Sequence, residues 1–427
     1  FEGEYSAGKR NGKGKEYNDD GKLIFEGEYL NGEKWNGKIN IYDRYSTLLF
    51  EGEYLNGKRN GKGKEYNDDG KLIFEGEYLN DEKLKGKINI YDRFSTLLFE
   101  GEYSAGKRNG KGKEYNNNGK LIFEGEHLND EKWNGYGKEF YYNGNIMFEG
   151  EYSKGKRNGK GMEYYEYGKY AKLKFKGEYL NGLRHGNGVE YNNYSELLFE
   201  GEYSKGIRNG KGKEYYYGRI LYEGEYLNAK KNGKGKDYYG NGKLMYDGEY
   251  LDGKKNGKGK DYYENGKLKF EGDYLEGKKN GKGKDYYENG DLIFEGEYIN
   301  ELRNGKGKEY ENGKITFEGE YLNGKRNGKG KEYYNEKLFF EGEYLNGERS
   351  GNGKEYDEAN ELIFEGEYLD GKRWNGKGIE FDINGGVVFE GEYLNGKRWN
   401  GKEEEFDWEN GELLSENELL NGIKIEN

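Results

Sequence analysis

The chain of 427 residues has no Cys and no Pro, so a disulfide framework and a collagen helix are both excluded, although 76 residues are Gly. Its formal net charge of -12 disfavours nucleic acid as the main partner. Charged residues make up 36% of the chain, as in many disordered proteins, but aromatic residues make up 17% and recur periodically, which indicates a folded chain.

One five-residue pattern, aromatic–acid–Gly–acid–aromatic, recurs along the whole chain. It begins at residue 1 and restarts every 23 to 27 residues, with occasional substitutions such as His127 for the last aromatic residue. A period of this length indicates an array of stacked repeats, in which each unit buries its apolar side chains against its neighbours. The 17 starts are Phe1, Phe25, Phe50, Phe74, Phe99, Phe123, Phe148, Phe175, Phe199, Tyr222, Tyr246, Phe270, Phe294, Phe317, Phe340, Phe364 and Phe389.

The repeats follow one another without a linker. Residues 1–147 hold three near-copies of a 49-residue double repeat. The seventh repeat contains an extra stretch at residues 164–170, where we expect a lengthened turn. We assign residues 1–412 to one continuous array, and residues 413–427, which fit the pattern without its aromatic residues, to a degenerate C-terminal capping repeat.

Each repeat predicts a β-hairpin. In residues 253–277, two runs rich in Tyr, Phe and Leu flank Asn265-Gly266, which favours a two-residue type I′ turn. The density of Gly and the period of two argue against a helix. Alternation places Leu268, Phe270, Gly272 and Tyr274 on one face, where a ring can lie over the bare backbone of Gly272. The sequence therefore predicts an all-β fold: an elongated, twisted antiparallel meander of about 17 two-stranded hairpin repeats in a single layer.

The second strand of a repeat, which follows a longer loop, can pair with the first in two registers. Pairing Glu4 with Lys15 gives a favourable cross-strand ion pair of about 0.2–1 kcal/mol. A shift by one residue places Tyr17 opposite Gly3 but sets Glu4 against Glu16. We favour the first register.

The repeat resembles the MORN repeat, in which the aromatic-x-Gly-x-aromatic strand is followed by Asn-Gly, by Gly-x-Gly and by a second Asn-Gly. The segment 261–268 is most similar to the variant found in bacterial antitoxin-like proteins. One departure is that the His-Gly common in the family survives only as His185-Gly186. The resemblance implies a meander of hairpins in one sheet, and a scaffold at membranes or in cytoskeletal assemblies, with phospholipid binding in some members.

Several motifs that could carry chemistry are better explained as structure. Residues 8–14 resemble a phosphate loop. However, only three residues separate Gly8 from the Gly-Lys at residues 12–13, where a phosphate loop has four, and no Ser, Thr or helix follows. Residues 18–21 resemble a calcium loop, but Gly27 occupies the position where Glu is required. His127 and His185 have no nearby Cys or second His. We therefore expect no catalytic residue, no metal site and no cofactor.

The longer loops carry the candidate binding residues. Four of the five Trp precede Asn-Gly in these loops, beside pairs of Lys and Arg that would form a basic edge of the sheet. Exposed Trp and basic residues suit an acidic partner or an anionic membrane. The alternative is that each Trp folds back over its own loop and fills it. The candidate residues are Trp35, Trp133, Trp374, Trp399, Lys325, Arg326, Lys372, Arg373, Lys397 and Arg398.

We expect a non-enzymatic repeat scaffold that mediates protein–protein interaction. The first alternative is a membrane-surface module that binds anionic phospholipid through the basic loop edge. The second is an accessory domain of an enzyme whose catalytic part lies outside this sequence. Neither nucleic acid nor a small-molecule substrate is an expected partner. The absence of Cys fits a reducing compartment, so we expect a cytoplasmic protein, and the resemblance adds a peripheral position at a membrane or the cytoskeleton.

Overall fold

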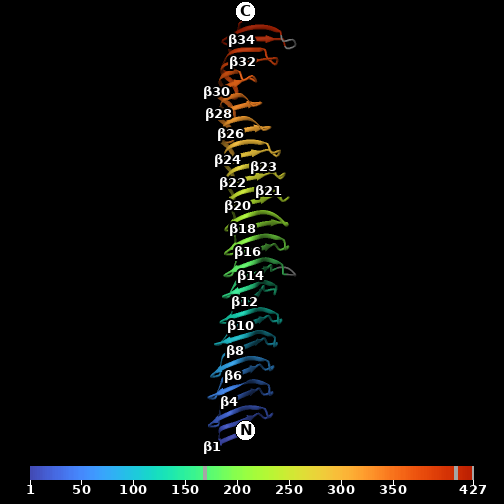
Figure 1. Cartoon of the computed structure of the whole chain (residues 1–427), viewed down its shortest axis with the longest axis vertical. Helices are drawn as coiled ribbons and strands as arrows, with labels where there is room; N and C mark the ends of the chain where they lie inside the picture. Colours follow the sequence, from blue (N-terminus) through green and yellow to red (C-terminus); the bar gives the residue numbers. More distant parts are fainter. Residues whose placement is uncertain (167–170, 408–411, 426–427) are drawn as a thin grey trace. The chain divides into compact units, whose positions relative to one another are not determined.

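The computed structural model describes residues 1–166, 171–407 and 412–425, and in this part of the chain it is all-β, without an α-helix. Its 36 strands form a single open antiparallel sheet (Figure 1). This confirms the predicted antiparallel meander of hairpins. Two strands for each of 17 repeats would give 34; the last hairpin, β35 and β36, comes from the segment whose motif has lost its aromatic residues.

The chain divides into two compact units, residues 1–208 and 209–427, which are described separately. The strands that begin in the first unit are β1 (Glu2–Ser6), β2 (Lys9–Tyr17), β3 (Leu23–Leu30), β4 (Glu33–Tyr42), β5 (Leu48–Leu55), β6 (Lys58–Tyr66), β7 (Leu72–Leu79), β8 (Glu82–Tyr91), β9 (Leu97–Ser104), β10 (Lys107–Tyr115), β11 (Leu121–Leu128), β12 (Glu131–Phe140), β13 (Ile146–Ser153), β14 (Lys156–Tyr164), β15 (Leu173–Leu180), β16 (Leu183–Tyr191), β17 (Leu197–Ser204) and β18 (Ile207–Tyr216).

The strands of the second unit continue the same alternation. They are β19 (Arg219–Leu227), β20 (Lys230–Tyr238), β21 (Leu244–Leu251), β22 (Lys254–Tyr262), β23 (Leu268–Leu275), β24 (Lys278–Tyr286), β25 (Leu292–Ile299), β26 (Leu302–Glu311), β27 (Lys314–Leu322), β28 (Lys325–Tyr334), β29 (Lys337–Leu345), β30 (Glu348–Tyr356), β31 (Leu362–Leu369), β32 (Lys372–Phe381), β33 (Val387–Leu394), β34 (Lys397–Phe406), β35 (Leu413–Leu420) and β36 (Ile423–Ile425).

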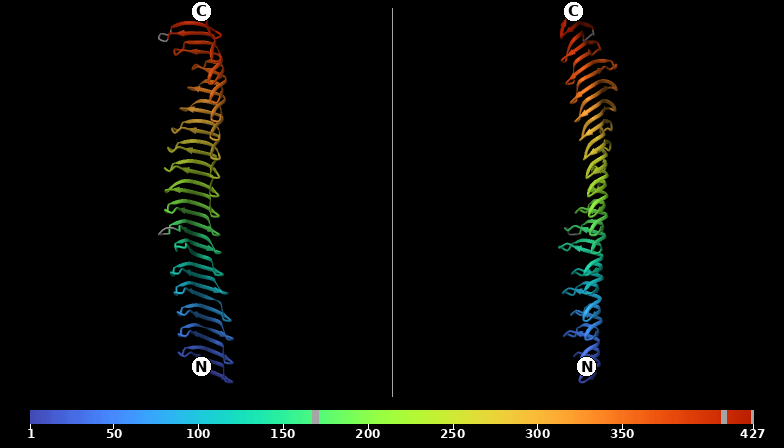
Figure 2. Two further views of the ribbon diagram at one scale, coloured as in Figure 1. Left: turned by 180° about the vertical axis from the view of Figure 1, so that it is seen from behind. Right: turned by 90° about the vertical axis from the view of Figure 1, so that its left-hand side faces the viewer.

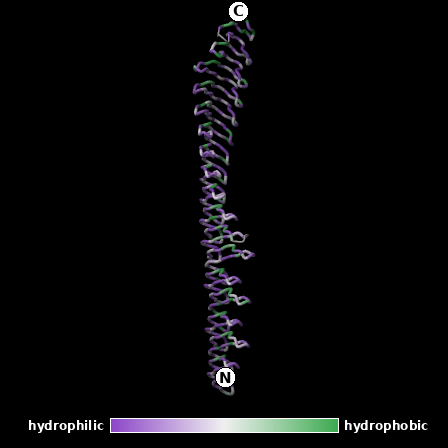
Figure 3. The backbone as a smooth tube through the Cα atoms, turned by 90° about the vertical axis from the view of Figure 1, so that its right-hand side faces the viewer, coloured by the Kyte–Doolittle hydropathy of each residue, from purple (hydrophilic) through white to green (hydrophobic). Residues whose placement is uncertain are grey.

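Each repeat consists of a motif strand, which carries the aromatic–acid–Gly–acid–aromatic pattern, and a return strand. Within each unit a tight turn joins the motif strand to its return strand at one edge of the sheet. At the other edge a longer loop leads to the next motif strand in most repeats, and a second two-residue turn, such as Asn312-Gly313, does so in the others (Figure 2). Hydrophobic and hydrophilic stretches alternate along the chain in both units (Figure 3).

The positions of the tight turn and the loop differ from the prediction. The two-residue turn is Asp252-Gly253, where φ is 50° and 85°, as a type I′ turn requires. Asn265-Gly266 belongs instead to a five-residue loop. The Tyr263 N–H donates to the Lys267 carbonyl (2.9 Å), and the Gly266 N–H donates to the Tyr263 carbonyl (2.8 Å). Asn265 does not have positive φ, because its Oδ1 accepts the Lys267 N–H (2.8 Å).

The predicted longer loop is part of the return strand. In β22, Lys255 pairs with Tyr250 and Gly259 pairs with Gly248, so the intervening residues form a β-bulge. Gly257 has a φ of 82°, and a Cβ on it would lie 3.1 Å from Cδ of Glu249. The second acid of the motif therefore lies against the bulge, and only Gly leaves room for it.

The register that we favoured is wrong. Glu2, not Glu4, pairs with Lys15, and Gly3 pairs with Gly14. This register keeps glycine opposite glycine, so that the ring of Phe1 can lie over both. The same pairing of motif and return-strand glycines recurs in later repeats, as in Gly272 with Gly283.

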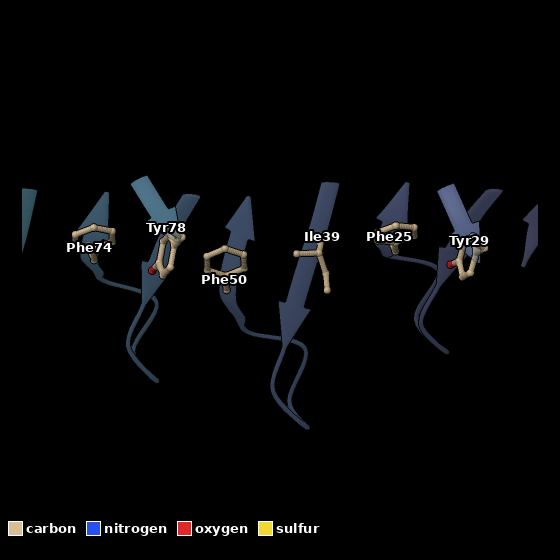
Figure 4. Close-up of a cluster of buried hydrophobic side chains, with 6 residues drawn as sticks. All are labelled: Phe25, Tyr29, Ile39, Phe50, Phe74 and Tyr78. Atoms are coloured by element: carbon tan, nitrogen blue, oxygen red, sulfur yellow. The ribbon is translucent and has the colours of Figure 1, made fainter. Parts of the chain in front are cut away.

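The core is a row of aromatic side chains on one face of the sheet. Phe25, Phe74 and the equivalent residues of most other repeats are buried, and so are Tyr29 and Tyr78. Figure 4 shows five aromatic members of this row together with Ile39. The rings meet edge to face, with centroids 5.0 Å apart for Phe25 and Tyr29. Each repeat thus completes the core of the next.

Two predictions concern the ends of the described segments. The lengthened turn expected at residues 164–170 lies partly outside the described residues, which end at 166 and resume at 171. At the C-terminal end, β35 pairs with β34 and β36 pairs with β35. The division into an array at 1–412 and a capping repeat at 413–427 stays a prediction.

Candidate binding surface

The two faces of the sheet carry different chemistry. The aromatic face holds the motif's Phe and Tyr, as Phe317 and Tyr321 show, and both are buried. The opposite face, called here the charged face, holds the motif's acids and two lysines of each return strand. Alternation along the strands assigns these residues to opposite sides.

On the aromatic face, the Arg or Lys at the second position of a return strand is part of the packing. The Arg326 guanidinium lies 4.1 Å from the ring centroid of Phe317. It also pairs with Glu309 (2.5 Å) and with Glu332 (3.2 Å) of its own repeat. In the second unit such contacts form a continuous series, Arg303–Glu309–Arg326–Glu332–Arg349–Glu355–Arg373. These arginines stabilise the array and are not free to bind a partner.

The predicted Trp residues lie in return strands rather than in exposed loops. Trp35, Trp133, Trp374 and Trp399 belong to β4, β12, β32 and β34, and all four are half-buried. The expectation that they sit in loops is therefore wrong.

The ring of Trp374 covers the tight turn of the next repeat. A Cβ on Gly396 would lie 3.2 Å from Cε3 of Trp374, and the Gly396 N–H donates to the Trp374 carbonyl (2.9 Å). Trp399 lies against Gly422 in the same way. This geometry matches the alternative in which Trp fills space against the neighbouring backbone.

The predicted basic residues separate into two groups. Arg373 stacks on Phe364 at 4.9 Å and pairs with Glu355 at 2.8 Å. Arg398 stacks on Phe389 and pairs with Glu403 at 2.6 Å. By contrast, the lysines that directly follow the tight turns, Lys325, Lys372 and Lys397, are exposed. The structure thus leaves only the lysines of this group accessible at the turn edge.

The charged face of the second unit is hollowed into a groove of about 1810 Å³ that spans Asp247 to Gly366. Its floor is glycine backbone, and its lining consists of motif acids and return-strand lysines. A smaller hollow of about 780 Å³ lies on the same face of the first unit. Glycine floors allow a ligand to approach the backbone closely.

Half of the groove's charges neutralise one another. The lysine that follows Gly-x-Gly in each return strand pairs with the first acid of the next motif strand, at 3.2 Å for Lys260 and Glu271. Burial alone would raise the pKa of Glu271, but hydrogen bonds from Tyr286 and Lys260 outweigh it and lower the pKa. Equivalent pairs are Lys284–Glu295, Lys308–Glu318, Lys331–Glu341 and Lys354–Glu365.

The other lysine of each return strand, which lies between the two glycines of Gly-Lys-Gly, is unpaired. Its cross-strand neighbour is the second motif acid, as for Lys258 and Asp273. That acid is turned to the bulge, where Asp273 accepts the backbone N–H of Lys282 (3.3 Å). Within the described residues, no carboxylate lies within ion-pair distance of Lys258, Lys282, Lys306 or Lys329. We call these four exposed residues the free lysine row.

Sequence reasoning missed the free lysine row. The signal was present, since Gly-Lys-Gly recurs in these repeats, but whether a lysine is paired depends on the bulge that turns its acidic neighbour away. The sequence pattern alone does not predict that geometry.

No group of three or more potential metal ligands occurs among the residues that the structure describes. His127 replaces a core Tyr, lies between Phe99 and Phe123 at 5.1 Å from each, and contacts Glu114 through Nε2 (3.1 Å). His185 is half-buried in β16. The described chain has no helix that is long and apolar enough to cross a membrane.

Comparison with known families and structures gives two results. A family model described as "MORN repeat" matches residues 1–22, 50–71, 99–120, 148–166, 175–195, 199–218, 294–315, 317–336 and 340–358. The model described as "MORN repeat variant" matches 231–252, 255–276 and 279–300. A search of curated proteins finds no match.

Similar solved structures include the crystal structure of TcdB2-TccC3, at 10% identity and a TM-score of 0.19, where the match covers 95% of this chain and 22% of that one. Another is the Photorhabdus luminescens Tc holotoxin pore with the TccC3 mutation D651A, at 13% identity and a TM-score of 0.19, covering 97% of this chain and 18% of that one. The chain spans about a fifth of the length of these chains.

Proposed function

Because this chain belongs to the MORN repeat family, we propose that it is a non-enzymatic scaffold that binds protein partners through the charged face of its second unit. MORN repeats form a non-catalytic repeat family and are commonly protein- or membrane-interaction modules. The observation that carries the proposal is the groove from Asp247 to Gly366, which presents the free lysine row over a glycine floor.

Three properties of this groove support binding of a protein segment. It extends over consecutive repeats, so it offers many weak contacts to an extended partner rather than one deep pocket. Its paired charges are already satisfied, so they favour selectivity more than affinity. Within the described residues the lysines of the free lysine row form no ion pair, and the second motif acids beside them lie against the bulge glycines, which favours an acidic partner.

The proposal is tested by reversing the free lysine row in the full-length chain. Lys258, Lys282, Lys306 and Lys329 are changed together to Glu, and proteins cross-linked to the chain in cells are compared with those of the wild type. A matched control changes Lys13, Lys111 and Lys160, exposed residues at the equivalent position of the first unit, to Glu. Loss of specific partners only in the groove variant supports the proposal. Retention of every partner by that variant contradicts it.

A second candidate function, binding of an anionic membrane, is favoured by one feature. Lys325, Lys372 and Lys397 are exposed at the tight-turn edge, beside exposed leucines such as Leu322 and Leu369. Lysine beside aliphatic side chains suits an anionic lipid surface. Co-sedimentation with vesicles that contain phosphatidylserine tests this function. Binding that falls with added salt, and that is lost when the three lysines become Gln, supports it; no binding at low salt rejects it.

A further inference from the structure

An aliphatic side chain recurs at one motif position in every repeat of the second unit, where it alternates with a return-strand residue such as Lys278 or Lys325. The residue after the last aromatic of each motif is exposed, from 37% to 56%, in eight consecutive repeats. These residues, called the leucine row, are Leu227, Leu251, Leu275, Ile299, Leu322, Leu345, Leu369 and Leu394.

The first unit does not have such a row. There, Ser6, Ser104, Ser153 and Ser204 occupy the same motif position in four repeats. The periodic apolar row and the large groove therefore occur in the same repeats of the second unit. Exposed apolar residues that gather on one surface mark interaction sites more often than single scattered ones do.

The leucine row and the free lysine row lie side by side on the charged face. Lys258 is the cross-strand neighbour of Asp273, and Leu275 is two residues from Asp273 on the same strand, so all three share one face. Leu275 is the last residue of β23 and lies two residues nearer the tight turn than Asp273 does. A ligand lying along successive repeats would contact leucines on one side and unpaired lysines on the other.

The spacing of both rows suits an α-helix. Successive members are two strands apart, or about 9.6 Å at ~4.8 Å per strand. In a helix, side chains seven residues apart are separated by about 10.5 Å along the axis. The heptad spacing of the helix exceeds the repeat spacing of the sheet by about 1 Å. Over four repeats this mismatch accumulates to about 4 Å, which is less than half of the distance between neighbouring leucines of the row. A helix of about four heptads can therefore stay in step with the rows.

We propose that the second unit binds an acidic amphipathic α-helix of a partner protein, with one aliphatic residue per heptad on the leucine row and Asp or Glu beside it on the free lysine row. The inference rests on the proposed scaffold function and specifies its partner. Charge complementarity selects this occupant, because the first acid of each motif is paired with Lys and the second acid lies against a bulge glycine, while the lysines of the row form no ion pair within the described residues. A lipid surface has no fixed spacing of charged and apolar groups, so it would not require the periodic spacing of the two rows.

The test uses the full chain and a fluorescent synthetic peptide of about four heptads, with Leu at one position of each heptad and Glu flanking it. Two control peptides have the same length. In one, the leucines are five residues apart, so that they no longer form one stripe; in the other, Lys replaces Glu. Binding is measured by fluorescence anisotropy at several salt concentrations.

Two multiple variants of the chain separate the contributions. Changing Lys258, Lys282, Lys306 and Lys329 to Gln should weaken binding about tenfold or more at low salt and reduce its salt dependence. Changing Leu275, Ile299, Leu322 and Leu345 to Ser should weaken it about tenfold or more at every salt concentration. Ser occurs naturally at this motif position in the first unit, so the second variant should fold. The control changes Leu30, Leu55, Leu79 and Leu128 to Ser and should bind as the wild type does.

The expected result is selective binding of the acidic heptad peptide by the wild type and by the first-unit control. Equal binding of the peptide with altered leucine spacing overturns the inference, as does equal loss in the first-unit control. Binding to phosphatidylserine vesicles without binding to the peptide also overturns it. If the lysine-reversed chain loses its cellular partners but the peptide does not bind, the helix inference fails while the proposed function stands.

Discussion

The ring of Phe270 lies over Gly272, two residues further along the same strand: a Cβ on Gly272 would be 2.7 Å from Cζ of Phe270 and 2.6 Å from Cα of Gly283. No real Cβ tolerates such distances, so the ring and the opposing backbone together exclude any side chain. The relationship recurs at the motif glycine of other repeats, including Gly319 beneath Phe317. It explains why a core so poor in aliphatic residues can pack closely.

Replacing Gly272 by Val should destabilise the chain by about 2–4 kcal/mol, because the new side chain displaces both the Phe270 ring and the adjacent strand. Replacing its neighbour Glu271 by Gln removes the ion pair with Lys260 but keeps an oxygen that can accept the Tyr286 hydroxyl, so it should cost less than about 1 kcal/mol. Chemical denaturation measures both. Comparable midpoints for the two variants would show that the ring does not require the bare backbone.

Replacing Arg326 by Ala should cost about 2–3 kcal/mol, because it leaves Glu309 and Glu332 half-buried with one cation fewer and uncovers the Phe317 ring. The matched control is Lys325→Ala at the adjacent exposed position, with an expected effect below about 0.5 kcal/mol. Thermal unfolding compares the two variants. Equal melting temperatures would mean that the ionic series contributes nothing to stability.

Acid should destabilise the first unit partly through Glu114. Burial alone would raise the pKa of Glu114, but the hydrogen bond with His127 and the charges of Lys132 and Arg108 outweigh it and lower the pKa to about 2 from 4.5. A carboxylate with a lowered pKa stabilises the fold above its ordinary pKa, and this contribution is lost as the pH falls from about 4.5 to about 2. The unfolding free energy of Glu114→Gln should therefore depend less on pH over this range. A slope equal to that of the wild type would contradict this.

Replacing Trp374 by Ala should lower stability by about 1–3 kcal/mol, because its half-buried ring covers the turn at Gly396. Tyr142→Ala, at a fully exposed loop residue, is the control and should have little effect. Urea denaturation followed by circular dichroism reports both. If Trp374 contributed mainly to partner binding, its loss would leave the denaturation midpoint unchanged.

The sequence predicted the repeat, the all-β meander and the buried face, because these depend on period-two alternation, as Phe270 and Tyr274 confirm. It did not predict which edge has the tight turn. Both edges offer Gly after a turn-forming residue, Asp252-Gly253 and Asn265-Gly266, and local propensity does not separate them. The bulge at Gly257 takes up the residues that were predicted to form a loop, and it lies against Glu249 on the neighbouring strand, a contact that local propensity does not contain.

The candidate site was predicted less well, for a related reason. Arg326 and Trp374 look like exposed binding residues when their segment is read as a loop. In the sheet, the first lies over Phe317 and the second over Gly396. The free lysine row is accessible because each acidic neighbour lies against a bulge glycine of the next return strand, a contact between strands that periodicity cannot reveal.

The central claim, that the charged face of the second unit is the binding surface, is tested most directly by a lysine footprint. The full chain is acetylated briefly with and without a purified partner obtained by cross-linking, and the modification of each lysine is quantified by mass spectrometry. We expect Lys258, Lys282, Lys306 and Lys329 to react in the free chain and to be protected in the complex, while Lys13, Lys111 and Lys160 react equally in both. A partner that binds but leaves the four groove lysines as reactive as before would contradict it.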